Sequence, residues 1–119
     1  MNKILVVDDS PTELRVVSDS LERRGFQVIT AMNGDDAIVK AESEQPTLVV
    51  LDVVMPKKNG FQVCRQLKRG SATQHIKIIL LTSKDQPSDR FWGMKQGADA
   101  YLVKPFQEDD LMQNVMRLI

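Results

Sequence analysis

The chain has 119 residues, which suits one domain with a single core, and its 16 Lys and Arg residues balance its 16 Asp and Glu residues. This zero net charge argues against a protein that binds nucleic acid or an anionic membrane through its overall charge. The single cysteine, Cys64, excludes an intrachain disulfide and fits a reducing, cytoplasmic location. We find neither a signal-peptide pattern nor an apolar run of membrane-spanning length, and we expect residues 1–119 to form one domain.

The first predicted element is an apolar strand at 3–7, which a helix follows directly. Ser10 is the expected N-cap, Pro11 takes the first helical position, and Glu13 has the spacing that closes a capping box. Gly25 is the expected stop of this helix.

The strand and helix pattern then recurs to the end of the chain. Further strands are predicted at 26–31, 47–51, 77–81 and 100–103, and further helices at 33–45, 61–68, 87–96 and 109–118. Strands such as ILVV, LVVL and KIILL are apolar rather than alternating, which is typical of a parallel sheet covered by helices on both faces. Right-handed crossovers bring the carboxyl ends of such strands to one edge, where ligands bind in open sheets.

Polar side chains follow the predicted strands at this edge. Asp8 and Asp9 follow the first strand, Asp52 the third, Thr82 the fourth and Lys104 the fifth. Carboxylates so close together either share a proton or hold a cation, and an oxygen-only set favours Mg²⁺ over Zn²⁺. The turn after the first strand lacks the glycines of a nucleotide cradle. The pattern therefore predicts a site for Mg²⁺ and a phosphoryl group, with the lysine and the threonine contacting phosphoryl oxygens.

Each of these residues also has a simpler interpretation. Asp8 and Asp9 fit a solvated strand end with a helix cap, and Asp52 fits a turn. Thr82 fits a β-branched strand residue, and Lys104 fits a solvated lysine. Their common place at successive strand ends favours the functional interpretation.

Four segments at these strand ends together resemble the receiver domain of two-component response regulators. They are VVDD at 6–9, LDVVMP at 51–56, LLTS at 80–83 and YLVKPF at 101–106, and the resemblance covers essentially the whole chain. It implies an α/β fold of the flavodoxin-like type, a doubly wound sheet of five parallel strands in the order 2-1-3-4-5 with five helices. It also implies a phosphorylation-controlled signalling switch, rather than an enzyme with a separate substrate.

The resemblance assigns a role to each residue of the site. Asp52 would accept the phosphoryl group from a histidine kinase. Asp9 and Asp52 would ligate Mg²⁺ directly with the backbone carbonyl of Val54, and Asp8 would act mainly through a bound water. Lys104 would pair with Asp52 at rest and with the phosphoryl group afterwards. The peptide bond that follows this lysine would be cis.

The implied switch consists of Thr82 and Tyr101. After phosphorylation the hydroxyl moves toward the phosphoryl group, the ring turns inward, and the face of the fourth helix, fifth strand and fifth helix changes shape. Val54 and Lys84 occupy positions that influence the lifetime of the phosphoryl group. Because Val54 has no side chain that could orient a hydrolytic water, we expect slow to moderate self-dephosphorylation.

The fourth predicted helix contains FWGM at 91–94, in which helical spacing turns Phe91 and Met94 toward the sheet. Trp92 then points about 100° away from Phe91, and we expect it to be partly exposed, although packing on a neighbouring helix is a simpler interpretation. The stretch 91–106 resembles stand-alone regulators of twitching motility and chemosensory systems. The residues expected at a partner surface are Trp92, Lys95, Tyr101 and Met112.

The expected partners are a histidine kinase as phosphodonor and a downstream target protein, with no direct role for nucleic acid or membrane. The chain would be a monomer or a weak, phosphorylation-dependent dimer. Since it stops after the fifth predicted helix, its output would be protein binding or service as a phosphate sink, unless it is part of a longer protein in which a DNA-binding domain follows. Two other functions remain open: a Mg²⁺-dependent phosphohydrolase with an Asp nucleophile, and an inert scaffold of the same fold. Such hydrolases typically place a second Asp where this chain has Val54.

Overall fold

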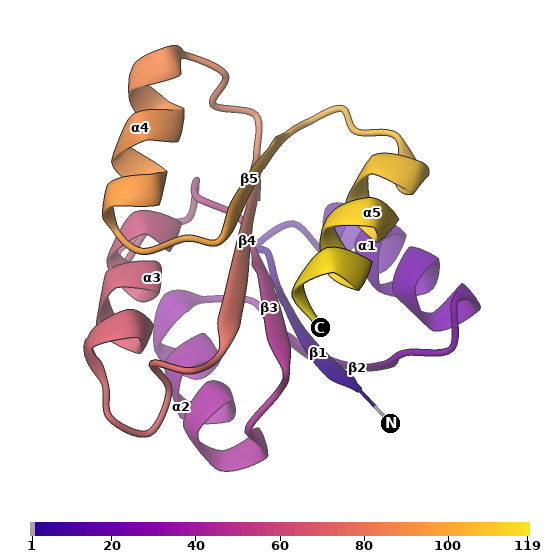
Figure 1. The fold of residues 1–119 in the computed structure, drawn as a ribbon, viewed down its shortest axis with the longest axis horizontal. Helices are drawn as coiled ribbons and strands as arrows, with labels where there is room; N and C mark the ends of the chain where they lie inside the picture. Colours follow the sequence, from indigo (N-terminus) through magenta and orange to yellow (C-terminus); the bar gives the residue numbers. More distant parts are fainter. Residues whose placement is uncertain (1) are drawn as a thin grey trace.

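In the computed structural model, which describes residues 2–119, one sheet of five parallel strands runs in the order β2-β1-β3-β4-β5 (Figure 1). The strands are β1 Lys3–Val7, β2 Gln27–Ala31, β3 Leu48–Leu51, β4 Lys77–Thr82 and β5 Ala100–Val103. The helices are α1 Pro11–Arg23, α2 Gly34–Glu44, α3 Gly60–Arg69, α4 Pro87–Lys95 and α5 Glu108–Leu118. This topology confirms the predicted doubly wound fold. Across residues 2–119, no helix has the length and apolar character that a membrane crossing requires.

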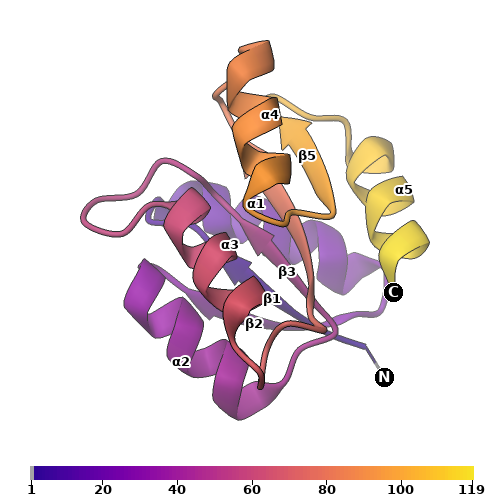
Figure 2. The ribbon, with the colours of Figure 1, turned by 60° about the vertical axis from the view of Figure 1, so that its left-hand side comes forward.

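Helices cover both faces of the sheet, with α1 and α5 on one side and α2, α3 and α4 on the other (Figures 1 and 2). Successive residues of β1 serve opposite faces, since Ile4 packs with the α1 and α5 side chains and Leu5 packs with those of α2 and α3. Both side chains are fully buried. An apolar residue is therefore required at positions 4–7 of this interior strand, all of which are buried.

Strand register brings the polar strand ends together. Val7 is level with Leu51 across β1 and β3, so Asp8 and Asp52 leave the sheet side by side. The backbone N–H of Asp52 donates to the carbonyl of Val7 at 3.0 Å. At the other end of the edge, the N–H of Lys104 donates to the carbonyl of Thr82 at 2.8 Å.

The start of α1 differs from its prediction in one respect. Ser10 caps the helix, because its hydroxyl oxygen accepts from the backbone N–H of Glu13, and Pro11 is the first helical residue. The carboxylate of Glu13 does not close the expected capping box and instead accepts from the ammonium of Lys104 at 2.9 Å. A charge-assisted bond to an ammonium is stronger than a bond to a backbone amide, so Glu13 bonds Lys104 rather than the backbone of Ser10.

Helix α4 lies on the sheet through a glycine, which corrects the prediction that Phe91 and Met94 face inward. Gly93 is its only fully buried residue, and a Cβ there would lie 2.8 Å from Leu80 and 2.9 Å from Tyr101. Phe91 is two positions, about 200°, from this contact and is therefore 64% exposed, while Met94 is 44% exposed. Trp92 is 50% exposed, as expected.

Candidate functional site

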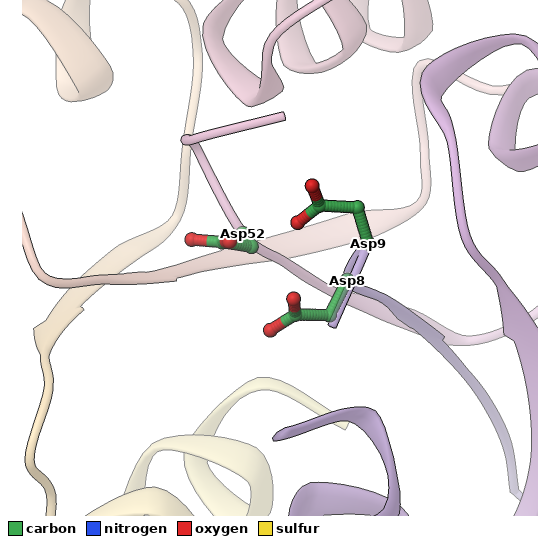
Figure 3. A group of neighbouring side chains, drawn as sticks. All are labelled: Asp8, Asp9 and Asp52. Carbon is green, nitrogen blue, oxygen red and sulfur yellow. The ribbon is translucent and has the colours of Figure 1, made fainter. Parts of the chain in front are cut away.

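Three carboxylates converge beyond the ends of β1 and β3, those of Asp8, Asp9 and Asp52. Their side chains turn into one space (Figure 3), and one oxygen from each lies within 4.8 Å of the other two. Asp8 and Asp52 are buried, whereas Asp9 is exposed to solvent. Two of the three acidic side chains are therefore buried, and the third, that of Asp9, is open to solvent.

Asp8 is fixed by hydrogen bonds to both of its carboxylate oxygens. One oxygen accepts from the backbone N–H of Ser10 at 2.9 Å, an interaction that closes the turn leading into α1. The other accepts from the ammonium of Lys104, also at 2.9 Å. Asp8 thus shapes the turn into α1 and orients the lysine.

Lys104 is held more closely by Asp8 and Glu13 than by Asp52. Its nitrogen lies 2.9 Å from both Asp8 Oδ2 and Glu13 Oε1, but 3.9 Å from Asp52 Oδ1. The expected resting pair of Lys104 with Asp52 is thus a longer contact, because Glu13 draws the ammonium toward α1. Burial lowers the pKa of Lys104, but its hydrogen bonds to Glu13 and Asp8 and the nearby charges raise the pKa overall. The lysine is therefore positively charged at neutral pH.

Glu13 could not be assigned to the site from the sequence, because its position fits a capping box. The peptide bond between Lys104 and Pro105 is cis, as the resemblance implied.

The carboxyl group of Asp52 has a pKa closer to neutral pH than that of an ordinary aspartate. Burial is the main cause that raises the pKa of its carboxyl from 3.8 to about 6, and the charge of Asp8 contributes to the rise. The charge of Lys104 and the backbone N–H of Val54, 3.5 Å from Asp52 Oδ1, act in the opposite direction. The lysine therefore does not offset the cost of burying the ionised carboxyl, and a cation at the site would lower this pKa.

The donor set fits Mg²⁺. All three side chains offer oxygen, which hard cations prefer, and in an octahedral Mg²⁺ site with bonds of about 2.1 Å, neighbouring ligand oxygens lie about 3 Å apart. Small side-chain movements would bring oxygens now within 4.8 Å of one another to that spacing. The backbone of Val54 is next to Asp52, and its side chain is exposed.

The loop after β3 depends on Gly60, which was not among the predicted site residues. A Cβ at this position would collide with the backbone carbonyl of Asp52, and the N–H of Gly60 donates to the carbonyl of Val53 at 2.9 Å. Asn59 and Gln62 form a reciprocal capping box that begins α3 at this point. Gly60 is the only glycine of the 55–60 loop, and this was the sequence signal for its role, because glycine permits close backbone approach.

Thr82 and Tyr101 are both hydrogen-bonded to Lys84. The buried hydroxyl of Thr82 accepts from the N–H of Lys84 at 3.3 Å, and the hydroxyl of Tyr101 donates to the carbonyl of Lys84 at 2.8 Å. The ring of Tyr101 is buried, with the guanidinium of Arg90 5.5 Å from its centroid. The backbone at Lys84 therefore connects the two residues of the expected switch.

Only half of the expected partner surface is accessible. Trp92 and Lys95 are exposed, but Tyr101 and Met112 are buried, which corrects their assignment to a docking surface in this conformation. Their side chains belong to the cores on opposite faces of the sheet. Met112 points inward because it lies on the same stripe of α5 as the buried Val115.

Residues 4–116 match the family model of the response regulator receiver domain. The chain is 46% identical to protein PilH of Pseudomonas aeruginosa, with 97% of this chain and 95% of that protein covered. It is 42% identical to the alkaline phosphatase synthesis transcriptional regulatory protein PhoP of Bacillus subtilis, and spans about half of that relative, 48% of its length. The structure of chemotaxis protein CheY4 of Vibrio cholerae superposes with a TM-score of 0.93 at 33% identity, and the match covers 100% of this chain and 99% of that one.

Proposed function

Since the chain belongs to the response regulator receiver family and is a phosphorylation-controlled switch of two-component signalling, we propose that its phosphoacceptor is Asp52. The observation that carries this assignment is the convergence of Asp52 with Asp8 and Asp9, one oxygen of each lying within 4.8 Å of the others. Asp52 is buried, lies 3.9 Å from the ammonium of Lys104 and follows a strand whose register with β1 places it beside Asp8.

Transfer to Asp52 requires a nucleophilic carboxylate and compensation of negative charge. With a pKa of about 6, most of the Asp52 side chains are ionised at pH 7 in the absence of a metal. A carboxylate oxygen attacks the phosphorus of a phosphohistidine, the phosphorus–nitrogen bond breaks, and the electron pair returns to the histidine nitrogen. Mg²⁺ bound by Asp9, Asp52 and the carbonyl of Val54, with Asp8 acting through water, would offset the charge on the phosphoryl oxygens.

Lys104 and Thr82 receive the phosphoryl group in this proposal. The ammonium of Lys104, 3.9 Å from Asp52 Oδ1, needs only a small movement away from Glu13 to bond a phosphoryl oxygen. The hydroxyl of Thr82 would donate to another phosphoryl oxygen. This new bond favours one of two conformations, because it exists only in the phosphorylated state.

Lys84 offers a route by which the change would reach the protein surface. Its N–H bonds the hydroxyl of Thr82, and its carbonyl holds the hydroxyl of Tyr101. A rotation of Thr82 would release the first bond and shift the second, which alters the packing of Tyr101 against Gly93 of α4. The face formed by α4, β5 and α5 would then bind a downstream target differently.

The lifetime of the acyl phosphate follows from its surroundings. Val54 is exposed and carries no polar group that could orient an attacking water, which supports slow to moderate self-dephosphorylation. Loss of the phosphoryl group within seconds in the purified protein would contradict this expectation.

The wider role of the chain is proposed from its membership of the receiver family. We propose that residues 1–119 act as one cytoplasmic receiver domain, with a histidine kinase as donor and a protein as target, and as a monomer or weak phosphorylation-dependent dimer. A role in twitching motility or chemotaxis is supported by the near full-length match to PilH and by the likeness to chemotaxis protein CheY4.

Mass spectrometry after treatment with acetyl phosphate and Mg²⁺ tests the assignment. We expect one phosphoryl adduct that maps to Asp52, disappears in Asp52→Asn and requires Mg²⁺, and the exposed Asp19→Asn variant is the matched control. An adduct on another residue would refute the assignment. Turnover of phosphate esters would instead favour a phosphohydrolase, and the absence of both an adduct and Mg²⁺ binding would favour an inert scaffold.

A further inference from the structure

The zero net charge of the chain conceals a strong segregation of charge along the sequence. Residues 53–84 contain no Asp or Glu at all. The same stretch carries several cationic side chains, which are Lys57, Lys58, Arg65, Lys68, Arg69, Lys77 and Lys84. Helix α3 lies within this stretch and therefore has no acidic residue to balance its Arg and Lys residues.

A groove between α3 and α4 collects part of this positive charge beside the only tryptophan of the chain. The groove has a volume of about 220 Å³. Its lining consists of Arg65, Lys68 and Arg69 from α3, Trp92 and Lys95 from α4, and Gln96 directly after it. The indole of Trp92 is half exposed here, so an aromatic surface lies open to solvent among cations.

Most of the cations in the groove are available to a ligand. Lys68 is engaged, because its nitrogen lies 2.9 Å from Asp99 and donates to the carbonyl of Ile76. In the part of the chain that the structure describes, Arg65, Arg69 and Lys95 form no ion pair with a carboxylate within 4.0 Å.

The groove is distinct from the α4, β5 and α5 face that the proposed function uses. Arg90 lies over the ring of Tyr101 on one flank of α4. Trp92 is two positions, about 200°, further around the helix and faces the α3 side. Phe91 lies on the ridge between these flanks and is 64% exposed, which extends the apolar surface next to the groove.

We propose that the groove between α3 and α4 docks an acidic, amphipathic segment of a partner protein. An apolar side chain of this segment would cover Trp92, and its carboxylates would bond Arg65, Arg69 and Lys95. Tryptophan and arginine are the residues that most often dominate the binding energy of protein interfaces. The proposal concerns a surface remote from Asp52 and does not depend on phosphorylation there.

The groove favours a protein segment over other anions for two reasons. A small inorganic anion would leave the apolar surface of Trp92 and Phe91 uncovered, so it would use only the charge of the site. A nucleic acid needs a long row of phosphate contacts. Lys58, nearer the start of α3, does not extend such a row, because it is paired with Asp35 at 3.0 Å.

The single tryptophan makes fluorescence a direct probe of the groove, since all tryptophan emission comes from Trp92. We expect a synthetic helical peptide of Glu and Leu, with its Leu residues on one face, to shift this emission to shorter wavelength and to bind saturably. The peptide with Lys in place of Glu should not bind. Asp52→Asn should bind the acidic peptide like the wild type, which separates this test from that of the phosphoacceptor.

Charge reversal identifies the surface. The double variant Arg65→Glu and Arg69→Glu should weaken binding by at least about tenfold. The matched control, Arg15→Glu with Arg117→Glu on α1 and α5, makes the same charge change elsewhere and should leave binding unchanged. The single variant Lys95→Glu should also weaken binding. A circular dichroism spectrum like that of the wild type would show that this loss does not come from a folding defect.

Four outcomes would overturn the proposal. The first three are no saturable shift with the acidic peptide, equal weakening by the control pair, and a full shift with inorganic phosphate alone. Stronger competition by single-stranded DNA than by the peptide at equal salt would identify a nucleic-acid surface instead and would also overturn it.

Discussion

Replacing Asp52 with Asn should stabilise the metal-free protein at neutral and alkaline pH, although it removes the proposed phosphoacceptor. Burial, with a further contribution from Asp8, raises the pKa of Asp52 from 3.8 to about 6. The folded state therefore prefers the protonated side chain more than the unfolded state does. Asparagine resembles the protonated carboxyl in size and carries no charge, so it removes the cost of ionisation.

The magnitude follows from the shift in pKa. A rise of about two units corresponds to about 3 kcal/mol between the two protonation states. Because the cluster opens to solvent beside the exposed Asp9, screening reduces this figure, and we expect a gain of about 1 to 2 kcal/mol in the free energy of unfolding. The favourable contribution of the protonated carboxyl is complete below pH about 4 and is lost as the pH rises through about 6.

Urea unfolding of both proteins in the presence of a chelator measures this difference. At pH 8 the Asp52→Asn variant should unfold at higher urea than the wild type, and the two should become equal toward pH 4. Saturating Mg²⁺ should stabilise the wild type more than the variant, because binding to the folded state adds to stability. The exposed Asp19→Asn variant is the control and should lie within about 0.5 kcal/mol of the wild type. A variant that is no more stable than the wild type at pH 8 without metal would refute this account of the cluster.

Three further predictions concern Glu13, Gly60 and Cys64. Glu13→Gln should weaken the bond between α1 and Lys104 and bring the ammonium of the lysine closer to Asp52. The rate of phosphorylation by acetyl phosphate at a fixed Mg²⁺ concentration should therefore change. An unchanged rate would argue against competition between Glu13 and Asp52 for the lysine. Gly60→Ala should cost about 2 kcal/mol or more in urea unfolding, because its Cβ meets the backbone carbonyl of Asp52, and wild-type stability would show that the loop yields easily. Burial raises the pKa of Cys64 to about 12, so its thiol should react with iodoacetamide at pH 8 only after unfolding in urea, and rapid labelling of the folded protein would contradict its buried position.

The fold and the main members of the site could be predicted from the sequence because both depend on local patterns. Uninterrupted apolar runs such as 48–51 indicate strands covered on both faces, and five strands separated by helices leave few topologies. Asp8, Asp9 and Asp52 each follow a strand directly, so parallel packing alone places them at one edge.

The remaining features depend on contacts between residues far apart in the chain. Glu13 and Lys104 are 91 positions apart, and only the packing of α1 beside the end of β5 decides that this glutamate binds the lysine rather than its own helix cap. Helical periodicity assigned Phe91 an inward position, but the rotation of α4 is set by the close approach that Gly93 allows. Periodicity describes the faces of one helix, whereas the choice of the face that meets the sheet depends on the side chains of other elements.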